Sequence, residues 1–197
     1  MISFEEFKVE ASKIPYQYRH PEFLYALVKW LKPTIVVEVG THIGMSAVWM
    51  ARGVQENGFG KLYCIDNFCW KEESQELQWN DNIDNCRVGN VIELLKGRSQ
   101  KVKWPDKVDI AFIDGNHTYS ICRWDTYKAK SLGATCIILH DTVSWEGSRR
   151  FSEEVRQQWV GWDFLEVMFD CGLMVALKRE EKGPCEGQDI GEKWDKV

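Results

Sequence analysis

The stretch IVVEVGTHIGMSAVWMA, residues 35–51, decides the fold class of this chain. Apart from Glu38, its first five residues are apolar and β-branched, which is typical of a strand buried on both faces. Two glycines, Gly40 and Gly44, then frame a short loop that leads into a helical pattern. In α/β proteins, a loop of this kind at the carboxyl end of a strand is where small ligands bind.

Apolar runs and helical periodicities alternate along the rest of the chain, which is the pattern of a sheet covered by helices. Strands are predicted at 34–40, 61–66, 108–115, 134–141, 162–169 and 172–179. Helices are predicted at 3–11, 21–33, 44–58, 120–133 and 149–160, with a partly helical stretch at 71–88. The segment 91–97 is predicted as a helix or a helix-to-strand junction.

The strand patterns also predict how the sheet is built. The runs 35–39, 108–113 and 135–139 are apolar on both faces, as expected of central parallel strands. The last two strands are joined by a very short turn, so they must be antiparallel to each other. We therefore predict an α/β, doubly wound, mostly parallel seven-stranded sheet of the Rossmann-like type, with an antiparallel closing strand pair and N-terminal helices.

Length and composition limit the class of protein. The chain has 197 residues and a net charge of -5. We expect a single domain over 1–180, with N-terminal helices in 1–33 and a flexible C-terminal tail at 181–197. A negative net charge is not typical of a protein that binds nucleic acid. No apolar run approaches the ~20 residues of a membrane helix. Seven cysteines without a C-x-x-C pair indicate reduced thiols and a cytoplasmic location.

The glycine loop favours a nucleoside ligand without phosphate groups. A dinucleotide fingerprint needs a glycine where this chain has His42, and a Walker loop needs a lysine that is absent. Asp66 ends the second strand, about 20 residues after Gly44, where an acid can accept hydrogen bonds from both hydroxyls of a ribose. Glu38 needs a partner in its apolar strand, either a cationic ligand group or the loop amides. An ordinary strand-to-helix turn is the alternative interpretation of this loop.

Four segments together resemble class I S-adenosylmethionine-dependent methyltransferases. They are EVGTHIGMS (38–46), LYCIDNF (62–68), VDIAFIDGNHTY (108–119) and CIILHDTV (136–143). The last two resemble a subgroup of small-molecule O-methyltransferases that includes macrocin-type sugar methyltransferases and cephalosporin-hydroxylase-like proteins. The resemblance extends over most of the chain and implies the cofactor S-adenosyl-L-methionine.

The resemblance also implies which residues bind this cofactor. The first motif would hold its amino-acid end, and the acid after the second strand would bind its ribose. The residues that follow that acid would border the adenine, and the Gly97-Arg98-Ser99 stretch lies where relatives contact the adenine. The implied cofactor-binding residues are Glu38, Gly40, Thr41, Gly44, Asp66, Asn67, Ser99 and Asp114.

Candidate catalytic residues follow the two central strands at 108–115 and 134–141. Asp114 and Asp141 end these strands, and two converging carboxylates suit a divalent cation such as Mg²⁺. His140, the third candidate metal ligand, stands where some relatives have Glu and would favour Mn²⁺, Fe²⁺ or Zn²⁺. The alternative for His140 is a structural histidine at a strand end. His117 is a candidate general base, and its alternative role is to order the loop by hydrogen bonding.

Residues outside these motifs are given less specific roles. Trp70, Trp79 and Trp145 lie in segments that overhang the strand ends, where they would either stack on a substrate or pack in the core. Asp125 is expected to be a solvated surface charge in its helix.

We predict an S-adenosylmethionine-dependent methyltransferase that acts on a hydroxyl of a small molecule, such as a sugar or a natural product, with assistance from Mg²⁺ or Mn²⁺. Asp114, His117 and Asp141 are the predicted catalytic residues. The expected partner is a small-molecule substrate, with no nucleic acid and no membrane, and a homodimer would form through the N-terminal helices. Two alternatives stay open: a nicotinamide-dependent oxidoreductase, and a catalytically inactive cofactor-binding scaffold.

Overall fold

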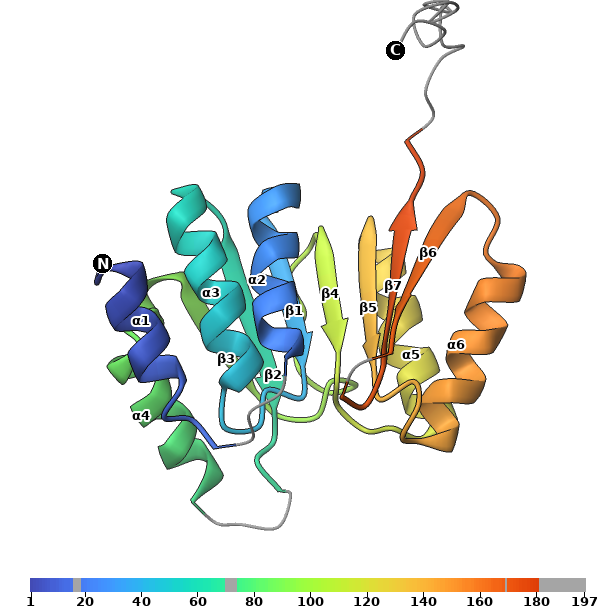
Figure 1. The fold of residues 1–197 in the computed structure, drawn as a ribbon. Helices are drawn as coiled ribbons and strands as arrows, with labels where there is room; N and C mark the ends of the chain where they lie inside the picture. The colour runs from blue at the N-terminus through green and yellow to red at the C-terminus, as the bar shows by residue number, and fades with distance from the viewer. Residues whose placement is uncertain (16–18, 70–73, 169, 181–197) are drawn as a thin grey trace, which may run out of the picture.

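The computed structural model describes residues 1–15, 19–69, 74–168 and 170–180. A seven-stranded sheet forms its centre, in the order β3-β2-β1-β4-β5-β7-β6 (Figure 1). The strands are β1 (Ile35–Val39), β2 (Lys61–Asp66), β3 (Ile92–Lys96), β4 (Ile110–Ile113), β5 (Cys136–His140), β6 (Trp162–Val167) and β7 (Leu173–Lys178). Neighbouring strands are parallel except that β7 is antiparallel to both β5 and β6. The predicted fold class is confirmed.

Helices cover both faces of the sheet (Figure 1). They are α1 (Phe4–Ala11), α2 (His20–Leu31), α3 (Met45–Asn57), α4 (Gln75–Asn85), α5 (Tyr119–Ser131) and α6 (Glu146–Gln158). The first four pack into one hydrophobic cluster with one face of the sheet, and the last two pack into a second cluster with the other face. None of the helices in the described ranges has both the length and the apolar composition that crossing a membrane requires.

The two clusters follow from the pleat of the central strands. Successive side chains of a strand point to opposite faces, so a strand between two helical layers must be apolar at every position. Val36 and Phe112 belong to the cluster with α1 to α4, whereas Val37 and Ile113 belong to the cluster with α5 and α6. This is why the apolar runs in the sequence predicted the central strands correctly.

The segment that we predicted as a helix or a helix-to-strand junction is a short 3-10 turn, Gly89–Val91, followed by strand β3. Of the two alternatives, the helix-to-strand junction is therefore confirmed and the helix is wrong: Glu, Leu and Lys favour helices, but pairing with a neighbouring strand can override such a preference. β3 pairs in parallel with β2, and its Leu94 and Leu95 pack against opposite faces of the sheet. The expected flexible tail, 181–197, lies outside the described residues.

The strand order reverses direction around β1, which lies between β2 and β4. Loops from these strands leave the sheet at its carboxyl edge, at the lower side of Figure 1. Gly40 follows β1 with φ of +87°, and its backbone N–H donates to the carbonyl of Ile65 at 2.8 Å. A Cβ at Gly40 would overlap the carbonyl oxygen of Asp114, which follows β4. Only glycine therefore lets the loop after β1 pack on the end of β4.

We expect Gly40→Ala to destabilise the fold much more than Gly58→Ala. Both glycines have positive φ, +87° and +79°, so alanine strains either backbone by about 1 kcal/mol. A Cβ at Gly58 would meet nothing within 4 Å, whereas at Gly40 it would also displace the end of β4, at a further cost of about 2 kcal/mol or more. Urea denaturation of both variants measures the difference, and equal losses of stability would contradict this account.

Candidate functional site

The glycine loop is held in place by Asp66, the last residue of β2. One carboxylate oxygen accepts the N–H of His42 at 2.8 Å, and the other accepts the N–H of Phe68 at 2.7 Å. The carboxylate thus connects the loop after β1 to the loop after β2. Each oxygen keeps a second lone pair, so it can still accept a hydrogen bond from a ligand hydroxyl. Asn67, the next predicted cofactor contact, is half-buried beside it.

Trp79 forms the wall of the same loop. Its indole N–H donates to the hydroxyl of Thr41 at 3.0 Å, and a Cβ at Gly44 would lie 3.0 Å from the indole ring. The ring is buried and makes an edge contact with Phe68 at a centroid distance of 6.4 Å. Trp79 therefore packs in the core, the alternative that we left open for it. Trp70 lies outside the described residues.

Glu38 lies beneath the loop and is fully buried in β1. Burial raises the pKa of its carboxyl group to about 8, and hydrogen bonds from Thr41 and Cys64 only partly oppose this effect. The Cys64 thiol donates to Oε2 at 3.4 Å, while Oε1 has no hydrogen-bond partner among the described residues. At neutral pH the group is therefore largely protonated, with one free acceptor beneath the loop.

Ser99, the predicted adenine contact, is buried, and its hydroxyl acts to lower the pKa of the Asp125 carboxyl group from α5. Gln100 also donates to Ser99 at 2.8 Å and approaches Asp125 at 3.4 Å. Asp125 has no exposed surface, so its prediction as a solvated charge was wrong. Arg123 and Lys128 suggested a solvated position in this helix, but Gln100, in the loop after β3, lies within 3.4 Å of the Asp125 carboxylate. Burial raises the pKa of Asp125 to about 6.

The predicted catalytic residues come together at the ends of β4 and β5. His140 Nδ1 lies 2.7 Å from Asp114 Oδ1 and 3.3 Å from Asp141 Oδ2. His117 Nε2 lies 3.1 Å from Asp141 Oδ2. These are ion-pair distances, but neither ring nitrogen of His140 has a well-aligned hydrogen-bond partner among the described residues.

The charges in this cluster are strongly coupled. Burial alone would lower the pKa of His140, but Asp114 and Asp141 outweigh it and raise the pKa to about 10. Burial likewise works to raise the pKa of Asp141, yet the close approach and charge of His140 hold this pKa below its usual range. His140 is therefore an imidazolium between two carboxylates whenever it binds no metal.

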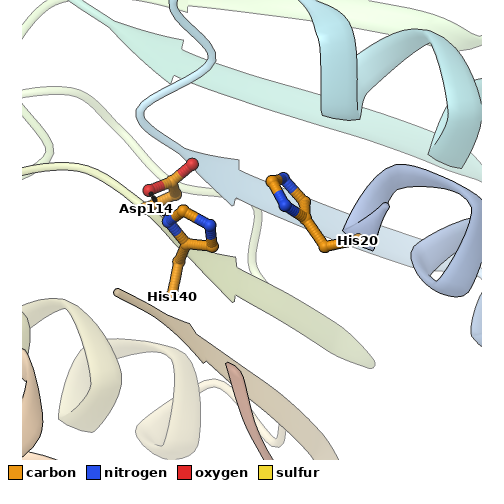
Figure 2. Close-up of side chains that lie close together, drawn as sticks. All are labelled: His20, Asp114 and His140. Atoms are coloured by element: carbon orange, nitrogen blue, oxygen red, sulfur yellow. Dashed lines mark ion pairs between the residues drawn. The ribbon is translucent and has the colours of Figure 1, made fainter. Parts of the chain in front are cut away.

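His20 belongs to the same cluster and is not among the residues predicted from the sequence. The side chain comes from the first turn of α2 and is only 2% exposed (Figure 2). Its ring centroid lies 4.5 Å from that of His140. Burial and the charge of His140 lower the pKa of His20 to about 3, so it is neutral. In the sequence, His20 is recognisable only as a histidine before Pro21 at the start of a helix. This pattern does not predict which strands the helix crosses, so it could not place His20 beside His140.

Trp145 borders the cluster on the solvent side. Its ring is stacked on that of His117, with a centroid distance of 5.3 Å and an interplanar angle of 25°. Trp145 is 51% exposed, so one face of the cluster ends in an accessible aromatic surface. Such a surface can stack on a sugar or on a planar ring.

The donor set fits a divalent cation. Ligand atoms about 2.1 Å from one ion and at right angles to each other lie about 3 Å apart. The separations of 2.7 and 3.3 Å from His140 to Asp114 and Asp141 are close to that value. The ligand atoms of Asp114, His117 and Asp141 also lie within 4.8 Å of one another. Little movement would be needed for these side chains to share an ion.

Comparisons with known proteins agree with this arrangement. A family model described as a methyltransferase domain matches residues 37–142. No curated protein sequence matches the chain. Among solved structures, the O-methyltransferase TomG from Streptomyces achromogenes, in complex with SAM, has a TM-score of 0.66 at 19% identity and covers 91% of this chain and 92% of its own.

Two further solved structures have the same fold. An O-methyltransferase from Bacillus cereus, in complex with SAH, has a TM-score of 0.63 at 22% identity, with 89% of each chain covered. The SAH-bound methyltransferase PaMTH1 from Podospora anserina has a TM-score of 0.66 at 13% identity, covering 89% of this chain and 87% of its own. At such identities the likeness concerns the fold.

We expect Asp125→Asn to remove a pH dependence of stability. The pKa of Asp125 is raised from 3.8 to about 6, so the folded protein keeps this proton at pH values where the unfolded chain has lost it. The resulting stabilisation is complete below about pH 4 and is lost as the pH rises to about 6, with a total of up to about 3 kcal/mol. Urea denaturation from pH 4 to 7 should show this fall in the wild type but not in Asp125→Asn.

Asp163→Asn is the control, because its side chain is 63% exposed on β6. Parallel stability curves for the wild type and Asp125→Asn would show that the buried carboxyl has no such effect.

Proposed function

Because this chain belongs to the methyltransferase domain family, we propose that it transfers a methyl group from S-adenosylmethionine to a hydroxyl of a small molecule. The resemblance to class I methyltransferases is thereby confirmed at the level of the family, and the macrocin-type subgroup stays a prediction. The nicotinamide-dependent alternative loses support, because the family match adds to the missing middle glycine at His42.

One observation carries the proposal: the loop suited to the cofactor packs directly against the cluster suited to the chemistry. A side chain at Gly40 would overlap the carbonyl of Asp114, and the Asp114 carboxylate lies 2.7 Å from His140. A cofactor bound at the loop would therefore bring its reactive carbon beside these side chains. Methyl transfer depends mainly on such alignment.

The loop residues are the proposed cofactor site. Gly40, Thr41 and Gly44 would receive the amino-acid end, above the free acceptor oxygen of Glu38. Asp66 would bind the ribose hydroxyls with its remaining lone pairs. Asn67 and Ser99 would border the adenine, and Asp114 would face the cofactor from β4. TomG and the Bacillus cereus enzyme, crystallised with SAM and SAH, support this assignment by their common fold.

The cofactor supplies a methyl group on a sulfonium, so the protein must align an acceptor hydroxyl and remove its proton. His117 is placed for the second task, since its Nε2 faces Asp141 at 3.1 Å and leaves Nδ1 to accept a proton. Asp141 would then stabilise the imidazolium that forms. Trp145, stacked on His117, would border the acceptor.

We propose that Asp114, His140 and Asp141 hold a divalent cation. Such an ion supplies Lewis acidity, which lowers the pKa of a bound hydroxyl. His140 must lose its proton to bind the ion, and the two carboxylates that raise its pKa would then become ligands themselves.

Asp66→Asn should weaken S-adenosylmethionine binding by about 10-fold or more, because an amide cannot accept both backbone N–H groups and both ribose hydroxyls. Isothermal titration measures the affinity of the wild type, of Asp66→Asn and of the exposed control Asp163→Asn. The wild type and the control should bind S-adenosylmethionine alike and should not bind NADH. Binding of NADH without binding of S-adenosylmethionine would refute the proposed function.

Asp141→Asn should keep cofactor affinity within about threefold and lose methyl transfer by at least about 100-fold. Asparagine is the suitable replacement because Asp141 has φ of +59°, which Asn tolerates. Transfer of labelled methyl from S-adenosylmethionine to a panel of catechols, flavonoids and glycosides provides the measurement. Unchanged turnover in Asp141→Asn would contradict the roles given to this carboxylate.

A further inference from the structure

We infer that His20 completes a metal site with His140 and Asp114, and that this site takes a first-row transition metal ion in preference to Mg²⁺. The inference rests on the proposed function, because it concerns the ion at the same centre. It adds a second nitrogen ligand, supplied by a helix that precedes all the strands.

The geometry of the three side chains is that of a candidate donor set. One potential ligand atom from each of His20, Asp114 and His140 lies within 4.8 Å of the others. The residues come from α2, the end of β4 and the last position of β5, and Figure 2 shows them converging on one space. His140 already lies 2.7 Å from Asp114, so His20 needs the largest movement to share an ion.

The environment of His20 shows that this imidazole is specifically positioned. It is 2% exposed, and its ring lies 6.0 Å from that of Phe112 in the cluster with α1 to α4. Polar groups hold the ring in this position, with the Ser46 hydroxyl 3.4 Å from Nε2 and Asp170 Oδ2 3.8 Å from Nδ1. Two imidazoles buried side by side next to a carboxylate form a donor set that suits transition metals.

A carboxylate behind His20 would orient it as a ligand. Asp170 Oδ2 lies 3.8 Å from Nδ1 of His20 and accepts the backbone N–H of Arg19 at 2.6 Å. Asp170 thereby ties the start of α2 to the turn before β7. Ligating histidines commonly have such an acceptor, which fixes the ring and raises its basicity.

The donor set decides which ion is preferred. Mg²⁺ prefers oxygen ligands, whereas imidazole nitrogens favour Mn²⁺, Fe²⁺, Co²⁺ or Zn²⁺. With His20 and His140 both ligating, two nitrogens and the carboxylate of Asp114 form the core of the site. Asp141, 3.3 Å from His140, can join this set or stay paired with His117.

Metal binding tests the inference without any acceptor. The full chain is dialysed against a chelator and titrated with Mg²⁺, Mn²⁺, Co²⁺ and Zn²⁺ by calorimetry, and the visible absorption of bound Co²⁺ reports nitrogen ligation. We expect one ion per chain, with at least 100-fold tighter binding of Co²⁺ or Zn²⁺ than of Mg²⁺. Tighter binding of Mg²⁺ by the wild type would overturn the inference, even if no variant could be prepared.

His20→Phe keeps the ring volume beside Phe112 but removes both nitrogens. It should weaken Co²⁺ binding at least 30-fold and change the Co²⁺ spectrum. Ser46→Ala is the matched control, because its hydroxyl lies 3.4 Å from Nε2 of His20 but ligates nothing in this proposal. It should keep the wild-type spectrum. His20→Asn is the second variant, in case the phenylalanine disturbs folding. Unchanged affinity and spectrum in a folded His20 variant would overturn the inference.

Titration of the same preparations with S-adenosylmethionine separates this inference from the proposed function. If the wild type binds no S-adenosylmethionine, the proposed function fails whatever metal is bound. If the wild type binds S-adenosylmethionine and Mg²⁺, and His20→Phe behaves identically, only the role of His20 fails.

Discussion

The rest of the structure depends on the close approach of Gly40 to the backbone of Asp114. Parallel pairing brings the carboxyl ends of β2, β1, β4 and β5 to one edge of the sheet, where their loops compete for space. A loop without a side chain at Gly40 can rest on the end of β4. The cofactor loop and the charged cluster are therefore contiguous. Asp66 fixes the outer side of that loop by accepting the N–H of His42, and it joins the loop after β2 through the N–H of Phe68.

Charge balance governs the cluster itself. Two carboxylates at the ends of adjacent strands would repel each other, and His140 between them supplies the compensating charge. The same nitrogen can ligate a metal only after losing its proton, so the proton and the ion compete for one place. If position 140 carried a carboxylate in place of the histidine, no imidazolium proton would have to leave before the ion binds. The metal-free site would then carry a larger negative charge. The histidine therefore affects both the choice of ion and the charge of the metal-free protein.

Much of the site could be predicted from strand ends alone. Asp114, His117, His140 and Asp141 follow apolar runs that are unmistakably central strands, and parallel strands bring their ends together. His20 and Asp125 could not be found in this way. Both lie on helices, and the position of a helical side chain depends on which strands the helix crosses and how it is rotated. Asp125 is buried against Ser99, and His20 lies beside His140, through packing that no local pattern encodes.

The sequence by itself determined three features, because each depends on residues that are close together in the chain. The hydrophobic period predicts the doubly wound sheet, the short turn predicts its antiparallel closing pair, and the glycine positions predict the nucleoside-type loop. The tertiary structure alone decided three other features. IELLK became the edge strand β3, because pairing with β2 outweighed helical preference. Asp125 became a buried acid, because α5 turns it toward the loop after β3. His20 joined the cluster because α2 packs on the face of the sheet that brings its first turn beside His140, where Asp170, far along the chain, accepts the N–H of Arg19.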